Sequence, residues 1–138
     1  MYHTGSGKST TIGMLTGAIA PTDGYIRILG KDVQSQMSSI RESMGICLQH
    51  NDCLFEKLTV RETLQLYCGI KGVYKRLTRE QADKIVDKSI LDIGLKEKSC
   101  TRVMHLSGGM KRKLCVAIAF CGDSKIILLD EPCSSMVR

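Results

Sequence analysis

Residues 106–113 read Leu-Ser-Gly-Gly-Met-Lys-Arg-Lys, and they lead into a segment whose apolar residues recur at helical spacing as far as Cys121. Gly122 is the expected stop of that helix. A serine and two glycines before a helix present backbone amides to an anion, and the helix dipole adds attraction. We therefore expect Ser107, Gly108 and Gly109 to form a cradle for a phosphate group.

A further phosphate-binding pattern lies near the start of the chain, where residues 3–10 read HTGSGKST. Residues 3–9 match the last seven positions of the eight-position loop G-x-x-x-x-G-K-[ST], and Tyr2 replaces its first glycine. In such loops the lysine reaches the β- and γ-phosphates and the serine coordinates Mg²⁺. The expected nucleotide-binding residues are Thr4, Gly5, Ser6, Gly7, Lys8, Ser9 and Thr10, with Ser9 also on the metal. The alternative is a flexible Gly/Ser turn at a chain end.

Two carboxylates follow the aliphatic run of residues 126–129, which has the length and composition of a strand buried on both faces. Ligands of open α/β sheets bind at the carboxyl ends of the strands, where Asp130 would hold the Mg²⁺ shell. Glu131 would then orient and deprotonate the attacking water. The alternative is a pair of acids that cap a strand before a proline turn.

Taken together, these segments resemble the motifs of ABC (ATP-binding cassette) ATPases in order and spacing. Residues 106–113 are similar to the family's signature motif, and Met110 in place of the usual Gln resembles the A subfamily. Residues 45–50 (GICLQH) and 58–62 (LTVRE) look like the Q-loop and the entry to the helical subdomain. The resemblance implies that Gln49 contacts the Mg²⁺ site, takes part in catalysis and couples it to transmembrane segments.

The resemblance also implies an α/β fold of the P-loop NTPase type, with a mostly parallel core sheet, a small antiparallel β part and a helical subdomain. Residues 1–52 and 104–138 would form the α/β core, and residues from about 53 to 103 the helical subdomain. The implied ligands are ATP and Mg²⁺. The implied partners are a second ABC nucleotide-binding domain, whose ATP the signature covers, and the transmembrane domains of a transporter. Such a chain works at the cytoplasmic face of a membrane, and A-subfamily members are mostly linked to lipid movement.

Local patterns predict the main helices and strands. A helix is expected over residues 8–17, strands over 25–29 and 44–48, and a third helix after Ser107. Thr59 with Glu62, and Thr78 with Gln81, have the spacing of capping boxes, which mark two further helix starts.

Composition limits the remaining possibilities. The chain has 138 residues, a net charge of +6 and 43% hydrophobic residues, which fits one globular domain. Apart from short groups at residues 75–76 and 111–113, the basic residues are dispersed, and no aromatic residues interleave with them, so nucleic acid is not an expected partner. The longest apolar run, residues 114–121, is far shorter than a membrane span. The seven cysteines are an odd number without a C-x-x-C pair, which argues against disulfides and a zinc site.

Both ends depart from the family pattern. The strand that feeds the phosphate loop, with its adenine-stacking aromatic residue, is absent, and Val137 stands where the family has an Asp. The family's switch histidine would lie beyond Arg138. We therefore expect an incomplete fold and weak or no ATP hydrolysis by this chain alone.

Three hypotheses follow for the function. The chain is an ATPase domain that drives transport once joined to its partners, or a non-catalytic module that binds nucleotide or a partner ABC domain, or an incomplete gene product. A soluble ABC ATPase without a transport role is a further alternative, which Met110 disfavours.

Overall fold

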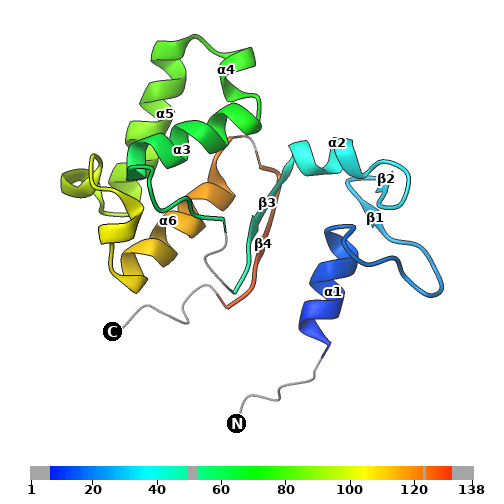
Figure 1. The fold of residues 1–138 in the computed structure, drawn as a ribbon. Helices are drawn as coiled ribbons and strands as arrows, with labels where there is room; N and C mark the ends of the chain where they lie inside the picture. Colours follow the sequence, from blue (N-terminus) through cyan, green and yellow to red (C-terminus); the bar gives the residue numbers. More distant parts are fainter. Residues whose placement is uncertain (1–6, 50–52, 123, 132–138) are drawn as a thin grey trace. The chain divides into compact units, whose positions relative to one another are not determined.

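The computed structural model describes residues 7–49, 53–122 and 124–131, and the chain divides into two compact units between Ser43 and Met44 (Figure 1). The first unit contains α1 (Lys8–Leu15), β1 (Arg27–Ile28), β2 (Lys31–Asp32) and α2 (Met37–Glu42). The second contains β3 (Met44–Cys47), α3 (Val60–Ile70), α4 (Val73–Arg76), α5 (Arg79–Asp92), the 3₁₀ turns Lys96–Lys98 and Val103–His105, α6 (Gly108–Phe120) and β4 (Ile126–Leu129).

The first unit holds a tight β-hairpin and two short helices. β1 and β2 pair antiparallel, and the two residues between them, Leu29 and Gly30, both have positive φ angles of 52° and 77°. Positive φ at both central residues is the geometry of the tight hairpin turn that matches strand twist. The expected strand over 25–29 is reduced to Arg27–Ile28: Leu29 belongs to the turn, and residues 25 and 26 precede the strand. The expected helix over 8–17 ends at Leu15, and Gly17 follows with a φ of 70°.

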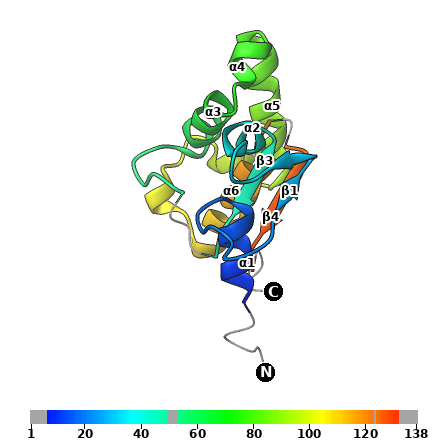
Figure 2. The ribbon, with the colours of Figure 1, turned by 90° about the vertical axis from the view of Figure 1, so that its right-hand side faces the viewer.

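The second unit is built on a parallel pair of strands. β3 and β4 are neighbours in register, with Met44 opposite Ile126 and Cys47 opposite Leu129. Helix α6 lies alongside both strands in both views (Figures 1 and 2). A Cβ atom on Gly45 would fall 1.8 Å from the carbonyl oxygen of Ala119, so only glycine permits this approach of strand and helix. The described strands thus form a mixed α/β fold with one parallel and one antiparallel pair.

Strand β4 differs from the expectation of a strand buried on both faces. Its first three residues are half-buried, and the side chain of Leu129 is exposed. In the part of the chain that the structure describes, β4 pairs with β3 alone. Among the described residues, no strand covers the other edge of β4.

Helices α3, α5 and α6 enclose the main apolar core. Both predicted capping boxes are present: the amide of Glu62 donates to the Thr59 hydroxyl over 3.2 Å, and the amide of Gln81 to the Thr78 hydroxyl over 3.3 Å. Each capping residue fixes where its helix starts and so which face is buried. The fully buried members of the core are aliphatic or sulfur-containing, and include Val60, Leu64, Cys68, Ala82, Val86, Val103 and Leu114.

One pair of cysteines departs from the expectation of reduced thiols. Cys68 in α3 and Cys121, directly after α6, are buried and joined by a disulfide across 53 residues of sequence. Their Cα atoms are 6.0 Å apart, a distance set by the packing of α3 against α6. Sequence spacing carries no sign of this contact.

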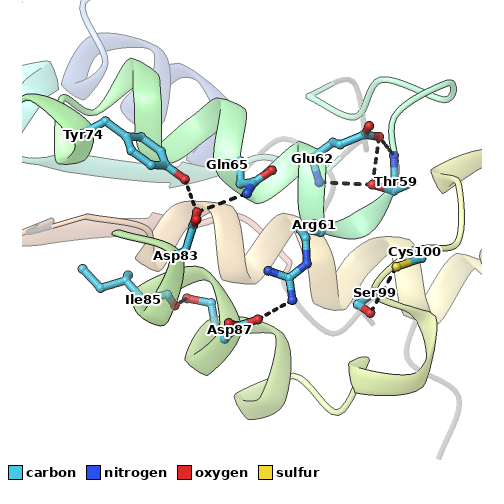
Figure 3. A network of polar contacts seen from close by, with 11 residues as sticks. Thr59, Arg61, Glu62, Gln65, Tyr74, Asp83, Ile85, Asp87, Ser99 and Cys100 are labelled. Atoms are coloured by element: carbon cyan, nitrogen blue, oxygen red, sulfur yellow. Dashed lines mark hydrogen bonds and ion pairs between the residues drawn. The ribbon is translucent and has the colours of Figure 1, made fainter. Parts of the chain in front are cut away.

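Polar contacts hold α3 and α4 to α5 on the outside of this core (Figure 3). The Asp83 carboxylate accepts hydrogen bonds from the Tyr74 hydroxyl, over 2.9 Å, and from the Gln65 amide, over 3.2 Å. These bonds lower the pKa of Asp83 below its ordinary value. Arg61 forms an ion pair with Asp87 one turn further along α5. No helix among the described residues is both long and apolar enough to span a bilayer.

Candidate functional site

The described part of the phosphate loop begins at Gly7, which precedes helix α1. Gly7 is left-handed, with a φ of 77°, and no side chain caps the helix. The first turn contains no acidic residue, and Lys8, Ser9 and Thr10 are exposed. The positive end of α1 is therefore suited to an anion, with a lysine and two hydroxyls beside it. Thr4, Gly5 and Ser6 lie outside the described residues.

The signature segment starts helix α6 as predicted. Ser107 is the N-cap residue, and its hydroxyl oxygen accepts the backbone amide of Met110 over 3.3 Å. Its hydroxyl hydrogen can be donated to another acceptor, since a serine hydroxyl both donates and accepts. Ser107 and Gly108 are exposed and Gly109 is half-buried, and the first turn carries no acidic residue. This helix start can therefore receive an anionic group from outside the chain.

The carboxyl ends of β3 and β4 bring together three of the predicted site residues. The amide of Asp130 donates to the carbonyl of Cys47 over 2.8 Å, which extends the strand pairing as far as the predicted metal ligand. Gln49 follows β3 by two residues and is exposed. Glu131 is exposed and has a positive φ of 47°, which is uncommon for a residue with a side chain. Such strained backbone positions are concentrated at functional sites.

Arg112 lies at the centre of this arrangement, and no sequence pattern assigns it a role there. It is fully buried in α6, with 0% of its surface exposed. Its Nη1 donates to the carbonyls of Leu48 and Gln49, the second over 3.3 Å. Its Nη2 donates to the carbonyls of Asp130, over 2.5 Å, and Glu131, over 2.8 Å. One guanidinium group therefore joins the signature helix to the ends of both strands.

The sequence around Arg112 contains one weak indication that this side chain is buried. It lies between Lys111 and Lys113, and as part of this basic run it is expected on a solvated surface. Helical spacing places it close to the face that carries Leu114 and Cys115, both buried. A charged residue beside the apolar face of a helix is a candidate for a buried, hydrogen-bonded role.

Three buried or half-buried thiols lie beside this bridge. Cys47 of β3 and Cys115 of α6 are buried together, and the sulfur of Cys53 is 3.5 Å from that of Cys115. Burial raises the pKa of Cys47, and the positive charge of Arg112 offsets part of that rise. The Cys47 thiol is therefore neutral at physiological pH, and the buried sulfurs pack as small apolar groups. Among the described residues no group of His, Cys, Asp and Glu is arranged to hold a metal ion.

The predicted residues thus fall into both units of the chain. Gly7, Lys8, Ser9 and Thr10 belong to the first unit, and Gln49, Ser107, Asp130 and Glu131 to the second. The predicted metal donors are a hydroxyl, a side-chain amide oxygen and a carboxylate. Such oxygen ligands suit Mg²⁺, so the residues present fit the ion that the sequence implied. Val137 lies outside the described residues.

Comparison with known proteins places the chain in a family. A family model described as ABC transporter matches residues 3–134. The chain belongs to the ABC transporter family. The match includes the phosphate loop from position 3, the Gln49 segment, the signature and the carboxylates after β4, so this is an ATP-binding domain of ABC type. The resemblance inferred from the sequence is confirmed.

Relatives of this ABC domain include members of the A subfamily. ABC transporter A family member 6 of Dictyostelium discoideum is 51% identical over 132 residues, covering 96% of this chain and 8% of that protein. The retinal-specific phospholipid-transporting ATPase ABCA4 of Homo sapiens is 42% identical over 134 residues, covering 97% of this chain and 6% of that protein. ATP-binding cassette sub-family A member 2 of Rattus norvegicus is 48% identical over 130 residues, covering 94% of this chain and 5% of that protein. The ABC domain therefore spans less than a tenth of these relatives.

Proposed function

We propose that this chain is the nucleotide-binding domain of an A-subfamily transporter, in which ATP binding and hydrolysis drive movement of a lipid across or within a membrane. The observation that carries the proposal is the meeting of Gln49, Asp130 and Glu131 at the carboxyl ends of β3 and β4, joined to the signature helix by Arg112. By similarity to the family, the phosphate loop with Gly7 and Lys8 also takes part in nucleotide binding.

Each residue has a distinct role in this proposal. The exposed amides at the start of α1, together with Lys8, bind the β- and γ-phosphates. Ser9, Gln49 and Asp130 hold the Mg²⁺ ion, which neutralises phosphate charge when bound. Glu131 orients the attacking water and accepts a proton from it, and Gln49 couples the Mg²⁺ site to the transmembrane segments. The signature residues 107–109 bind the γ-phosphate of ATP that is held by a second ABC nucleotide-binding domain.

The wider setting follows from the relatives. The human and mouse ABCA4 proteins and the rat ABCA3 protein are named as phospholipid-transporting ATPases. By similarity, we infer that this chain acts with transmembrane domains at the cytoplasmic face of a membrane, and that the transported substrate is a lipid. Residues 1–52 and 104–138 then form the α/β core of the domain, which contains a mostly parallel sheet. Residues from about 53 to 103 form its helical subdomain.

Binding of nucleotide tests the first step. Thermal unfolding of the full chain should shift upward with MgATP, because ligand at 100 times its dissociation constant stabilises the folded state by about 2.7 kcal/mol. Lys8→Met should remove most of this shift. Lys57→Met, at an exposed position outside the predicted site, is the matched control and should retain it. An unfolding temperature of the wild-type chain that MgATP leaves unchanged would refute nucleotide binding.

A second candidate function is the same module without turnover, in which the chain binds nucleotide or a partner ABC domain. The departure at Val137, where the family has an Asp, favours it. Loss of one catalytic contact of this kind costs on the order of a hundredfold in rate or more. Phosphate release by the purified chain distinguishes the two. Turnover that Glu131→Gln abolishes would establish the enzyme, whereas binding with no turnover would support the module.

A further inference from the structure

We propose that Arg112 is a positioning residue that sets the spacing between Gln49 and the Asp130–Glu131 pair, and so holds the metal-binding and water-binding groups in register with the signature helix. The inference rests on the proposed function, because it assumes that these residues meet Mg²⁺ and nucleotide. It adds a residue to which neither the motifs nor the family comparison assigns a role.

The geometry of the contacts carries the inference. Nη1 is bonded to two consecutive carbonyls after β3, and Nη2 to two consecutive carbonyls after β4. The two segments are far apart in the sequence, and pairing between their strands ends with the bond from the Asp130 amide to Cys47. Beyond that point the guanidinium fork is a direct hydrogen-bonded link between the two backbones. Any shift of one segment relative to the other must break at least one of these bonds.

Burial explains why the position requires arginine. A charged group with 0% exposure is tolerated only where hydrogen bonds replace its hydration. The planar fork of arginine offers five N–H donors in fixed directions, so its two terminal nitrogens can satisfy two separate pairs of acceptors. Lysine keeps the charge but has a single nitrogen, which cannot reach both pairs in the same way. Lysine at position 112 therefore separates the effect of charge from that of the fork.

The link also runs to the signature. Arg112 lies five residues after Ser107 on the same helix, and the start of that helix is fixed by the bond from the Met110 amide to the Ser107 hydroxyl. A rigid helix transmits the position of its first turn to a side chain little more than one turn later. The signature residues, Gln49 and Glu131 are thus held in one hydrogen-bonded frame. A change in the position of the signature, such as contact with a second domain, would therefore move the strand ends.

The test compares the full wild-type chain with Arg112→Lys and Arg112→Gln. Lys113→Gln is the matched control, since it removes a charge from the neighbouring, exposed position of the same helix. Two quantities are measured on each: hydrogen exchange of the Asp130 amide by NMR in the absence of ligand, and the dissociation constant of a fluorescent ATP analogue in Mg²⁺ and in EDTA. The dissociation constant in EDTA divided by that in Mg²⁺ isolates the contribution of the metal from that of general nucleotide contacts.

We expect exchange of the Asp130 amide to become at least about tenfold faster in both Arg112 variants, because the strand ends open locally. We also expect the ratio of dissociation constants to fall by about tenfold or more, since displacement of a positioned group by about 1 Å costs up to a hundredfold. The constant in EDTA should remain close to that of the wild type. A variant that is merely less stable would weaken both constants together.

The outcomes separate the two proposals. Exchange and ratio unchanged in Arg112→Lys, in a chain that binds MgATP, would overturn the positioning role and leave the proposed function standing. If exchange is faster in the Arg112 variants but the wild-type chain binds no nucleotide, the hydrogen-bonded bridge is shown and the proposed function is refuted. The role of Arg112 toward the metal is then refuted as well. Equal changes in Lys113→Gln would also overturn the inference, because they would reflect lost charge alone.

Discussion

Replacement of Gly45 by alanine tests the packing on which the site depends. Gly45 lies in β3, and the added Cβ would fall 1.8 Å from the carbonyl oxygen of Ala119 and 2.7 Å from its carbonyl carbon. Both atoms belong to the backbone of α6, so no side-chain rotation relieves the clash. Even a contact of 3.0 Å, at the lower limit for real Cβ atoms, requires the strand and helix to separate by at least 3.0 − 1.8 = 1.2 Å.

The cost follows from what that separation opens. Cys47, Cys115 and Ala119 are each 1% exposed and pack between β3 and α6, so they would lose close contact. Overpacking of a dense core costs about 1–3 kcal/mol and occasionally more. Because the clash is with backbone, we expect the upper end, about 3 kcal/mol. For a chain of this size, that lowers the melting temperature by about 10 °C.

Gly69→Ala is the matched control for this substitution. Gly69 lies in α3, is exposed, and has nothing within 4 Å of an added Cβ. Both variants remove the same backbone freedom from the unfolded chain. In a helix, alanine stabilises relative to glycine by about 0.5–1 kcal/mol. The two variants should therefore shift the thermal midpoint, followed by circular dichroism, in opposite directions. Equal midpoints would refute the reasoning from close approach.

Three further outcomes are expected. Thr59→Ala should lower the free energy of unfolding by about 1 kcal/mol in urea titrations, because the cap of α3 is lost. Acid should destabilise the chain. Hydrogen bonds from Thr59 lower the pKa of Glu62, and hydrogen bonds from Tyr74 and Gln65 lower the pKa of Asp83. The stability that each carboxylate contributes is therefore present above its pKa in the unfolded chain, and it is lost as pH falls through its lowered pKa in the folded chain. Urea midpoints from pH 7 to pH 2.5 should fall mainly below about pH 4.5, and Thr59→Ala should reduce the fall. Tyr74→Phe should reduce it as well, and a pH dependence unchanged in both variants would contradict these assignments.

Much of the second unit could be predicted from residues close together in sequence. Capping boxes at Thr59 and Thr78 act within one helical turn, so their pattern determines where α3 and α5 start. Strand β4 could be predicted from its run of four aliphatic residues, and β3 from the mostly apolar residues before the polar segment that starts at Gln49. The predicted strand over 25–29 was too long, because the turn at Leu29 depends on left-handed backbone geometry at a non-glycine residue.

The candidate site shows where local patterns end. The sequence by itself determined the family and the chemical groups, because Lys8, Gln49, Ser107, Asp130 and Glu131 belong to motifs of fixed local spacing. Only the tertiary structure decided that Arg112 is buried against four carbonyls, that Gly45 touches Ala119 and that Cys68 meets Cys121. Each of these contacts joins residues more than 15 positions apart, and the packing of α6 against β3, β4 and α3 brings them together. Spacing along the chain reports what a helix or turn requires, whereas contacts between elements depend on how those elements pack.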